Sequence, residues 1–299
     1  CNVQGTTVPL TILKNGTEEQ KKKYVKPLVT CEALGAFLMT EPNAASDVAA
    51  IETTAKEDGD YFILNGTKAW ITNAEVMDYG IVFAKTDPTK RAKGISAFIV
   101  EKGMPGLSAR TYKNKLAMRM SNTGEVIFKD VRVPKENLLG KIGEGLKVGL
   151  SALDYGRASV AARSLGLAQA CLDAMLKYAN EREQFGQKIG NFQMVQSWIA
   201  DTVIDVEAAR LLVYRAAWLQ DQGKLAGREA SIAKTFASET VVKASNTVMR
   251  VYGAYGISEE YPVGSYYRDS IVMVSGEGTN NIQKTILALD ALGWKKFKD

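Results

Sequence analysis

The sequence predicts a multidomain α+β protein with a short helical segment (1–34), a middle β domain (35–138) and a C-terminal helical bundle (139–299). Three observations predict this class. Helical patterns open the chain, short apolar or alternating runs separated by turns follow, and helical periodicity then continues almost unbroken to the end. With 299 residues, 46% of them hydrophobic, the chain can form large cores and about two domains.

The first segment consists of helical pieces interrupted at "KNGTEEQ". Thr17 followed by Glu18, Glu19 and Gln20 is typical of a helix start, because a threonine side chain caps the first N–H groups and acids favour the positive end of the helix dipole. The chain opens on Cys1 rather than Met and shows no targeting pattern, so we expect an upstream portion to precede it.

The middle segment contains runs typical of short strands, namely "LGAFLMT", "YFILNGTKAWIT", "YGIVFAKT", "GISAFIVE" and "GEVIFKDVRVP". Turn residues such as "EDGD", "TDPTK" and "GMPG" separate them. Many short strands at this spacing predict a small barrel or sandwich.

The last segment carries the one-face apolar stripes of packed helices. The stripe in "GLAQACLDAMLKYANEREQFG" comprises Leu167, Ala170, Cys171, Ala174, Met175 and Tyr178. Similar patterns fill 192–222, 227–252 and 280–294. Three glycines fall near the expected helix ends, Gly186, Gly223 and Gly253.

Composition excludes several classes of function. The chain has no His, which rules out a Ser-His-Asp triad and leaves a carboxylate, Lys, Tyr or Cys for any proton abstraction. The net charge of +5 is spread among interspersed acids and bases, a pattern that does not favour nucleic-acid binding. Three cysteines without metal-like spacing indicate a reducing compartment and no metal site. No apolar run approaches the ~18 residues of a membrane span.

One carboxylate has an unusual setting. In "VSGEGTNNIQKTIL", Glu277 stands between Gly276 and Gly278, just before a helical pattern. An acid near a helix N-terminus is ordinary, because the helix dipole favours it. Bare backbone on both sides would also let a substrate approach the carboxylate closely, which suits a general base.

Two strand ends in the middle domain carry polar groups. "FLMTEPNAASD" ends a strand in a turn with Thr40, Asn43 and Ser46, which by itself is an ordinary turn. In "NGTKAWITNA", Trp70 and Thr72 are two apart on a strand and therefore share one face. Trp70 is either a core residue or, with Thr72, the border of a flat heteroaromatic ligand.

Two helical segments also carry candidate groups. In "NEREQFGQKIGNFQ", which closes one helix and opens the next, Arg182 and Phe185 could grip a phosphate and stack on a base. In "LDYGR", Asp154 and Arg157 are three apart on a helix, which is usually a surface pair.

Taken in order, the segments "TEPNAASD", "NGTKAWITNA", "ISAFIVEKGMPGL", "VRVPKENLLG", "EREQFGQKIGNFQ", "YGAYGISEEYPV", "YRD" and "EGTNNIQ" resemble the acyl-CoA dehydrogenase family over essentially the whole chain. The chain is most similar to the short-chain (butyryl) and glutaryl-CoA members. The resemblance implies an N-terminal helical domain, most of it absent here, a middle β domain and a C-terminal four-helix bundle.

The resemblance implies FAD as cofactor and Glu277 as the base that takes the α-proton of an acyl-CoA while the β-hydrogen leaves as hydride to flavin N5. The implied FAD-binding residues are Phe37, Met39, Thr40, Ser46, Trp70, Ile71, Thr72, Arg182, Gln184, Phe185, Phe192, Gln193, Arg250, Gly253, Ala254, Thr279 and Asn281. The implied substrate-binding residues are Ser46, Ser121, Asp154, Tyr155, Arg157, Gly276 and Gly278.

Among these residues, Arg182, Gln184, Phe185, Gln193 and the segment 250–254 would reach the FAD of a neighbouring subunit, so a homo-oligomer, a dimer of dimers, is implied. Three positions depart from the family pattern. Arg250 replaces the usual Gln, Ala254 the usual Gly, and Gly276 the usual Tyr before the base.

The family further implies an electron-transferring flavoprotein as electron acceptor, and a cytoplasmic location in bacteria or the mitochondrial matrix in eukaryotes. Two alternatives stay open. An acyl-CoA oxidase or related flavin monooxygenase on the same fold would pass electrons to oxygen. A non-enzymatic helical scaffold or a redox-dead paralogue would be ruled out by a yellow protein that bleaches on adding acyl-CoA. The acyl group itself is not determined by the sequence.

Overall fold

The computed structural model describes residues 2–224 and 226–297, without the side chain of Asp154. The chain divides into two compact units. The sheet unit comprises Cys1–Lys115 and Arg119–Gly156, and the helical unit comprises Leu116–Met118 and Arg157–Asp299. The expected α+β class, with a middle β domain and a C-terminal helical domain, is confirmed. The three-part division at residues 34 and 138 stays a prediction.

The sheet unit opens with short helical segments. These are η1 (Val3–Thr7), α1 (Val8–Asn15), α2 (Glu18–Gln20), η2 (Lys21–Val25) and α3 (Lys26–Val29). The predicted helix start at Thr17 is confirmed, because the Gln20 N–H donates to the Thr17 hydroxyl at 3.2 Å and the Thr17 N–H donates to the Gln20 side chain at 3.1 Å. This reciprocal capping satisfies N–H groups that the first turn leaves without helical partners.

Eight described strands form one mixed sheet, in the order β6-β7-β3-β2-β4-β5-β8, with β1 parallel to β4. Their bounds are β1 (Gly35–Leu38), β2 (Thr54–Asp58), β3 (Tyr61–Thr72), β4 (Tyr79–Lys85), β5 (Ile95–Glu101), β6 (Leu107–Thr111), β7 (Thr123–Pro134) and β8 (Leu138–Leu139). Short 3-10 turns η3 (Val48–Ala50), η4 (Ala92–Gly94) and η5 (Lys135–Asn137) and helix α4 (Gly145–Leu150) complete the unit.

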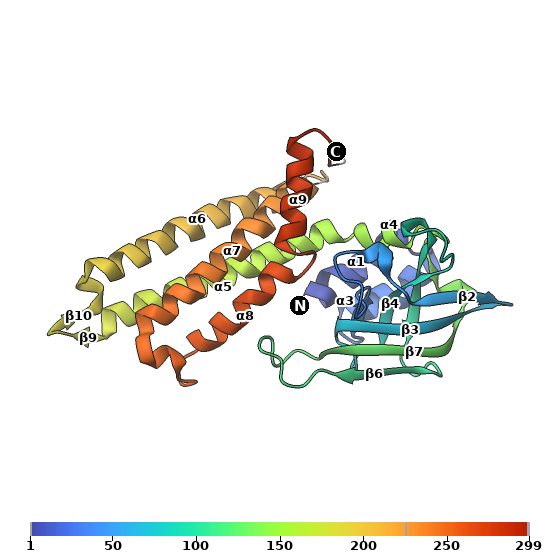
Figure 1. Cartoon of the computed structure of the whole chain (residues 1–299), viewed down its shortest axis with the longest axis horizontal. Helices are drawn as coiled ribbons and strands as arrows, with labels where there is room; N and C mark the ends of the chain where they lie inside the picture. The colour runs from blue at the N-terminus through green and yellow to red at the C-terminus, as the bar shows by residue number, and fades with distance from the viewer. Residues whose placement is uncertain (1, 225, 298–299) are drawn as a thin grey trace. The chain divides into compact units, whose positions relative to one another are not determined.

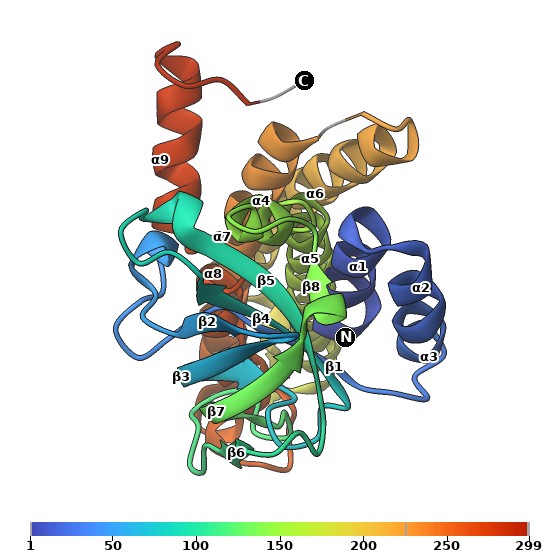
Figure 2. The ribbon, with the colours of Figure 1, turned by 90° about the vertical axis from the view of Figure 1, so that its right-hand side faces the viewer.

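The sheet is covered on both faces at β4 and β5. Figure 2 shows α1, α2 and α3 together on one side of the sheet, and the helical residues Val8, Ile12 and Tyr24 share a core with Phe83 and Ile99. A second core lies on the other face. Burial on both faces explains why "YGIVFAK" and "ISAFIVE" are continuous apolar runs rather than alternating ones.

Strand β3 is irregular where it carries Trp70. Its pairing with β7 shifts register between Lys68 and Ile71, and Trp70 has a φ of 59°. Lys68 is fully buried, and its ammonium donates to the Glu41 carboxylate at 2.7 Å and to the Met39 carbonyl at 3.2 Å. The ion pair therefore ties the segment after β1 to the bulge in β3.

The helical unit is built from long helices (Figure 1). These are α5 (Leu153–Glu181), α6 (Gln193–Asp221), α7 (Gly227–Tyr252), α8 (Val263–Ser275) and α9 (Asn280–Ala291), with 3-10 turns η6 (Ile189–Asn191) and η7 (Gly253–Ile257). The predicted stripe on α5 faces the core, where Cys171, Met175 and Tyr178 are buried. The Tyr178 ring stacks on that of Tyr252 with centroids 4.0 Å apart.

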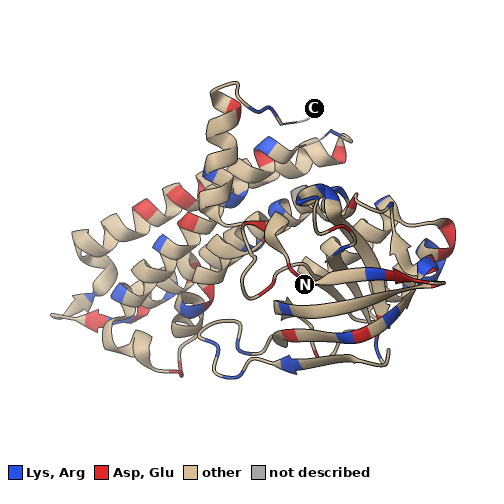
Figure 3. Cartoon of the chain, turned by 45° about the vertical axis from the view of Figure 1, so that its right-hand side comes forward, with Lys and Arg blue, Asp and Glu red and all other residues tan. Residues whose placement is uncertain are grey.

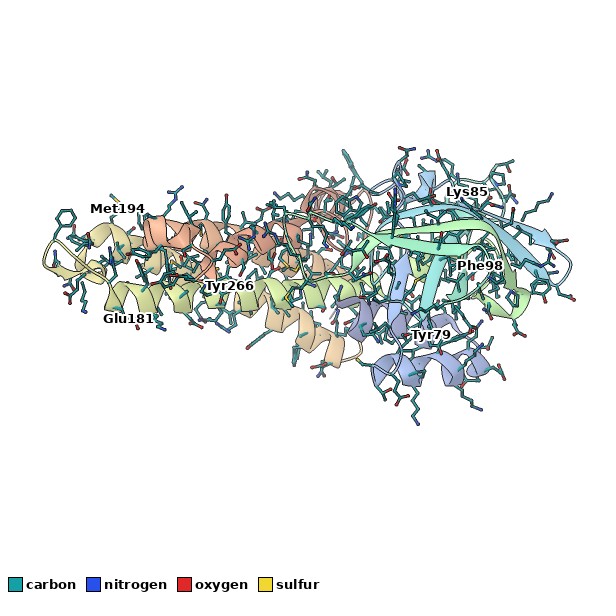
Figure 4. The ribbon with its side chains drawn as sticks, turned by 90° about the horizontal axis from the view of Figure 1, so that it is seen from below. Tyr79, Lys85, Phe98, Glu181, Met194 and Tyr266 are labelled. Atoms are coloured by element: carbon teal, nitrogen blue, oxygen red, sulfur yellow. The ribbon has the colours of Figure 1, made fainter. Side chains whose placement is uncertain are left out.

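The connection between α5 and α6 differs from the simple helix junction that the sequence predicts. It is a tight hairpin of β9 (Glu183–Gln184) and β10 (Gln187–Lys188), and Gly186 lies in its turn rather than at the end of α5. Glu181 and Met194 mark the two helix ends beside this hairpin in Figure 4. Phe185 and Gly186 both have positive φ, as a two-residue hairpin turn requires. Gly223 and Gly253 do follow helix ends.

Charges of both signs alternate along strands and helices in the view of Figure 3, so the net charge of +5 is not gathered on one element there. Among the described residues, no helix is both long enough and apolar enough to cross a membrane.

The first prediction concerns the buried ion pair. Lys68→Met should destabilise the protein by about 3–5 kcal/mol, because it leaves the Glu41 carboxylate buried without its cation. The double variant Lys68→Met, Glu41→Gln should recover much of that loss, and Lys135→Met, which removes an exposed pair with Glu57, should cost less than about 1 kcal/mol. Urea unfolding measures all three. Equal losses in the single and double variants would contradict this account.

Candidate active site

The turn between α8 and α9 presents Glu277 in a strained conformation. Gly276 ends α8 with φ −66° and ψ 151°, an extended conformation open to any residue. Glu277 then has a φ of 54° and Gly278 a φ of 86°. A left-handed backbone is uncommon for a non-glycine residue and costs about 1–3 kcal/mol, so the surroundings must hold it there.

A buried lysine supplies one such restraint. Lys234 lies on α7 with no exposed surface. Its ammonium donates to the Val274 carbonyl at 3.1 Å, the Gly278 carbonyl at 3.0 Å and the Asn280 side-chain oxygen at 2.7 Å. These acceptors lie on both sides of Glu277, so the ammonium connects the whole turn to α7.

Cations surround the turn. Lys234 and Arg163, which lies on α5, both interact electrostatically with the Glu277 carboxylate. Burial lowers the pKa of Arg163, while the charges of Glu277 and Asp269 oppose that shift. Arg157, also on α5, is only 9% exposed and repels Lys234. The helical unit therefore brings predicted residues Arg157 and Glu277 into one charged cluster.

The start of α9 extends this cluster. Thr279 caps the helix by accepting the Ile282 N–H at 3.3 Å, and Asn281 is exposed in the first turn. A helix N-terminus with a hydroxyl and an amide side chain attracts phosphate groups, which fits the predicted contact with the FAD pyrophosphate.

In the sheet unit, two predicted segments come together. The Ala69 N–H donates to the Thr40 carbonyl at 2.9 Å, which places Thr40 beside the bulge with Trp70. The Trp70 indole is 66% exposed and lies against the Tyr112 ring at 4.8 Å. Ile71 is buried and Thr72 half-buried, which fits the prediction that Trp70 and Thr72 share a face.

The other predicted residues of the sheet unit vary in exposure. Phe37 is half-buried against Phe83, Met39 is buried, and Ser46 is exposed. Ser121 is half-buried, with its hydroxyl 3.2 Å from that of Thr123.

The first turns of α5 carry two further predicted residues. The ammonium of Lys14 lies 4.1 Å from the centre of the Tyr155 ring. Asp154 lies outside the residues whose side chains are described.

A second group of predicted residues gathers at the β9–β10 hairpin. Phe185 is 94% exposed at its tip, and its ring lies nearly perpendicular to that of Phe192, with centroids 6.0 Å apart. The Arg182 guanidinium lies 5.1 Å from the Tyr255 ring, which follows Ala254 directly. The exposed residues Gln184, Gln193, Arg250, Gly253 and Ala254 lie in the same segments. Within the helical unit, this group is at the opposite end of α5 from α9 (Figure 1).

Backbone strain coincides with three of the predicted site residues. In the described part of the chain, eight non-glycine residues have positive φ, and Trp70, Phe185 and Glu277 are among them. Such outliers gather at functional sites because binding and catalysis require unusual side-chain directions.

Two segments of the chain match domains of a known protein family. Residues 36–131 match the acyl-CoA dehydrogenase middle domain, and residues 143–292 match the acyl-CoA dehydrogenase C-terminal domain. The chain belongs to the acyl-CoA dehydrogenase family. It is an FAD-dependent enzyme that dehydrogenates acyl-CoA thioesters, and the oxidase alternative is not favoured.

This acyl-CoA dehydrogenase is similar in sequence and structure to several individual family members. It is 49% identical over 288 residues to a glutaryl-CoA dehydrogenase of Desulfococcus multivorans, covering 96% of this chain and 74% of the relative. It is 44% identical over 277 residues to the "Caffeyl-CoA reductase-Etf complex subunit CarC" of Acetobacterium woodii, covering 93% and 73%. A solved glutaryl-coenzyme A dehydrogenase complexed with glutaryl-CoA superposes with a TM-score of 0.96 at 47% identity, covering 99% and 75%.

Sequence reasoning missed four residues that shape the dehydrogenase's site, Glu41, Lys68, Arg163 and Lys234. For two of them a signal was present. Lys68 continues the inward alternation of Phe62 and Leu64, and Lys234 stands in the apolar helical stripe of Ala230, Ala233 and Ala237. A lysine at a position that periodicity assigns to the core predicts a buried cation with a specific partner.

Proposed function

We propose that Glu277 is the base that removes the α-proton of the acyl-CoA. The observation that carries this proposal is the left-handed conformation of Glu277 between two helices, flanked by Gly276 and Gly278. The sequence has no His, so a carboxylate held in this way is the residue suited to the task. The Glu277 carboxylate interacts electrostatically with Arg163 and Lys234, so it belongs to the charged cluster around the turn.

The proposed chemistry follows from acidity. An α-proton is far less acidic than a free Glu side chain, whose pKa is ~4.3, so the base must be held close to the substrate in a water-poor site. The Glu277 carboxylate takes the proton, and the released electron pair forms the Cα=Cβ bond as the β-hydrogen departs as hydride. FAD, when bound, accepts that hydride. The backbone N–H of Glu277 is the proposed donor to the thioester oxygen.

The residues of the sheet unit fit a flavin. An exposed indole at Trp70, with Thr72 two residues further on and Thr40 bonded to the neighbouring Ala69, offers an aromatic face and polar residues to a flat heteroaromatic ring. In the helical unit, Thr279 and Asn281 at the start of α9 suit the pyrophosphate. We assign these residues to FAD, with the CoA arm assigned to Ser121, Tyr155 and Arg157.

The acyl group is proposed to be bulkier than butyryl. The backbone at Gly276 does not require glycine, since its φ is −66°, and an added Cβ would meet only the Val272 carbonyl, at 3.6 Å, among the described atoms. The missing side chain therefore leaves space beside Glu277 for substrate. A branched, cyclic or aryl acyl-CoA fits this space, and the caffeyl-CoA name of one relative supports an aryl group.

The dehydrogenase is further proposed to be a homo-oligomer in which the β9–β10 hairpin contacts a neighbour's FAD. Arg163, which is coupled to Glu277, and Arg182 are 19 residues apart along α5, or roughly 28 Å at about 1.5 Å per residue. One FAD molecule is shorter than that separation. The exposed Phe185 ring would then stack on the cofactor of the partner.

Electrons are proposed to leave through an electron-transferring flavoprotein, because one relative is named as part of an Etf complex. The sequence also lacks a strand-linked G-x-G-x-x-G nicotinamide motif. Oxygen consumption during turnover would instead favour the oxidase class.

The second prediction tests the base. Glu277→Gln should retain FAD and bind acyl-CoA but lose flavin reduction by roughly 10²–10⁴-fold, the usual contribution of a general base. Anaerobic stopped-flow bleaching of the flavin measures the rate. Asp290→Asn, at an acid on the far part of α9, is the control and should leave the rate unchanged. Reduction of Glu277→Gln at the parent rate would refute the assignment.

The third prediction tests the acyl pocket. Gly276→Tyr should fill the space beside Glu277 with a ring that buries ~150–250 Å², and so shift the preference toward small linear acyl-CoAs without loss of FAD. Flavin bleaching with a panel of butyryl, glutaryl, branched and aryl acyl-CoAs gives the ranking. An unchanged ranking would show that substrate does not use this space.

The fourth prediction tests the hairpin. Phe185→Ala should weaken FAD retention, and each tenfold loss in affinity should remove about 1.4 kcal/mol of the stabilisation that excess FAD provides. Met194→Ala, another exposed apolar residue near the hairpin, is the matched control. Flavin content and melting temperature, measured with added FAD, report the effect. A fully loaded monomer in either variant would contradict a shared cofactor site.

A further inference from the structure

Lys234 is the most completely buried cation of the helical unit among the described residues. It lies in a stripe of small residues on α7 that includes Ala230, Ala233 and Ala237, all buried. An ammonium in such a place loses its hydration, so a lysine is retained there only if specific acceptors replace the water.

The three acceptors lie on both sides of Glu277, at the end of α8, in the turn and at the start of α9. The Val274 carbonyl lies three residues before Glu277, the Gly278 carbonyl directly after it, and Asn280 begins α9. One ammonium therefore holds the end of α8, the turn and the start of α9 against α7. A non-glycine residue keeps a left-handed backbone only where several contacts hold it, and these hydrogen bonds are such contacts.

The third acceptor is itself oriented by α7. The Asn280 amide group donates to the Ser238 hydroxyl at 2.9 Å and to the Glu239 carboxylate at 2.8 Å. Its oxygen is thereby directed at the Lys234 ammonium. Two turns of α7 thus set the start of α9, and Lys234 alone among these residues reaches both sides of Glu277.

The protonation state of Lys234 determines how many hydrogen bonds its side chain can donate. The ammonium has three N–H groups and makes three hydrogen bonds to the turn. A neutral amine has two N–H groups and cannot satisfy all three acceptors. Loss of the proton therefore releases at least one point of the turn.

We propose that Lys234 is a positioning residue for proton abstraction, whose three hydrogen bonds hold Glu277 in the conformation from which it reaches the substrate. This rests on the proposed role of Glu277. Lys234 acts through its hydrogen bonds to the backbone of the turn and to Asn280, beside its electrostatic interaction with Glu277.

The charged groups around Lys234 set the pH at which its ammonium loses a proton and, with it, one hydrogen bond to the turn. Burial and Arg157 on α5 lower the pKa of Lys234 to about 8, while Glu239 on α7 and Glu277 on the turn oppose the shift. Charged groups on three helices packed against α7 have other partners. From α6, Asp205 pairs with Lys243; from α9, Lys284 pairs with Glu239; and Asp269 of α8 accepts the Met118 N–H.

The positioning role and an effect on global stability predict pH dependences of opposite sign. The pKa of Lys234 in the folded protein is below its value of ~10.4 in the unfolded chain, so between pH 8 and 10 the unfolded chain binds more protons. The contribution of Lys234 to stability therefore rises over this window. Flavin reduction should fall over the same window, because the turn loses a hydrogen bond.

The experiment measures the anaerobic flavin-reduction rate of the FAD-loaded protein from pH 6 to 9.5, with melting temperature and acyl-CoA affinity at each pH. The wild type should lose rate above about pH 8. Lys234→Arg keeps its charge at every pH, so its profile should lack this alkaline decline. Lys234→Met should reduce its flavin about 10²-fold more slowly with acyl-CoA affinity within threefold of wild type, as expected for a misplaced catalytic group.

Lys243→Met, at an exposed lysine on the same helix, is the matched control and should match wild type throughout. A wild-type rate that is flat to pH 9.5, a decline that persists in Lys234→Arg, or a wild-type rate in Lys234→Met would each overturn the proposal. If Lys234→Met does not load FAD, the wild-type and Lys234→Arg profiles decide. Unimpaired reduction by Glu277→Gln would refute the base assignment itself, and is a separate result.

Discussion

The ion pair between Lys68 and Glu41 is the interaction on which the sheet unit depends. Its side chains are 0% and 4% exposed, so each charge is stable only because the other is there. Although burial alone would raise the pKa of Glu41, the charge and hydrogen bond of Lys68 lower it. The pair fixes the chain after β1 against the β3 bulge, and the strained, exposed Trp70 follows from that bulge.

The helical unit also contains a buried lysine that connects separate segments, but the hydrogen-bond acceptors of this lysine are different. Lys234 also bridges segments that are distant in the sequence, but its acceptors are two carbonyls and an amide rather than a carboxylate. Burial lowers the pKa of each of these lysines to about 8, with Glu41 opposing the shift at Lys68 and with Glu239 and Glu277 opposing it at Lys234. In each unit, therefore, a buried ammonium holds irregular backbone beside a residue that we assign to the reaction.

Two residues beside the Glu277 turn bear on the substrate pocket. Gly276 opens space beside Glu277, and Arg163 adds a partly buried cation whose one described hydrogen bond is to the Met273 sulfur at 3.3 Å. The proposed base is thus kept, while glycine in place of the usual Tyr changes the size of the wall next to it. Such a change alters which acyl group fits without altering the reaction.

The sequence by itself determined the α+β class, the order of β domain and helical bundle, the Thr17 cap, the core stripe of α5 and the unusual setting of Glu277. These are local properties: periodicity, capping and glycine placement act over a few residues, so the sequence displays them directly. The same reasoning placed Gly186 at a helix end, because a two-residue hairpin between long helices leaves only a weak local signal. The tertiary structure alone decided the partners of Lys68 and Lys234, which are 27 residues away at Glu41 and 46 away at Asn280. It also decided the left-handed conformations of Trp70 and Glu277. A buried ammonium selects whichever acceptors the fold brings within about 3 Å, and that selection depends on long-range packing that no local pattern encodes.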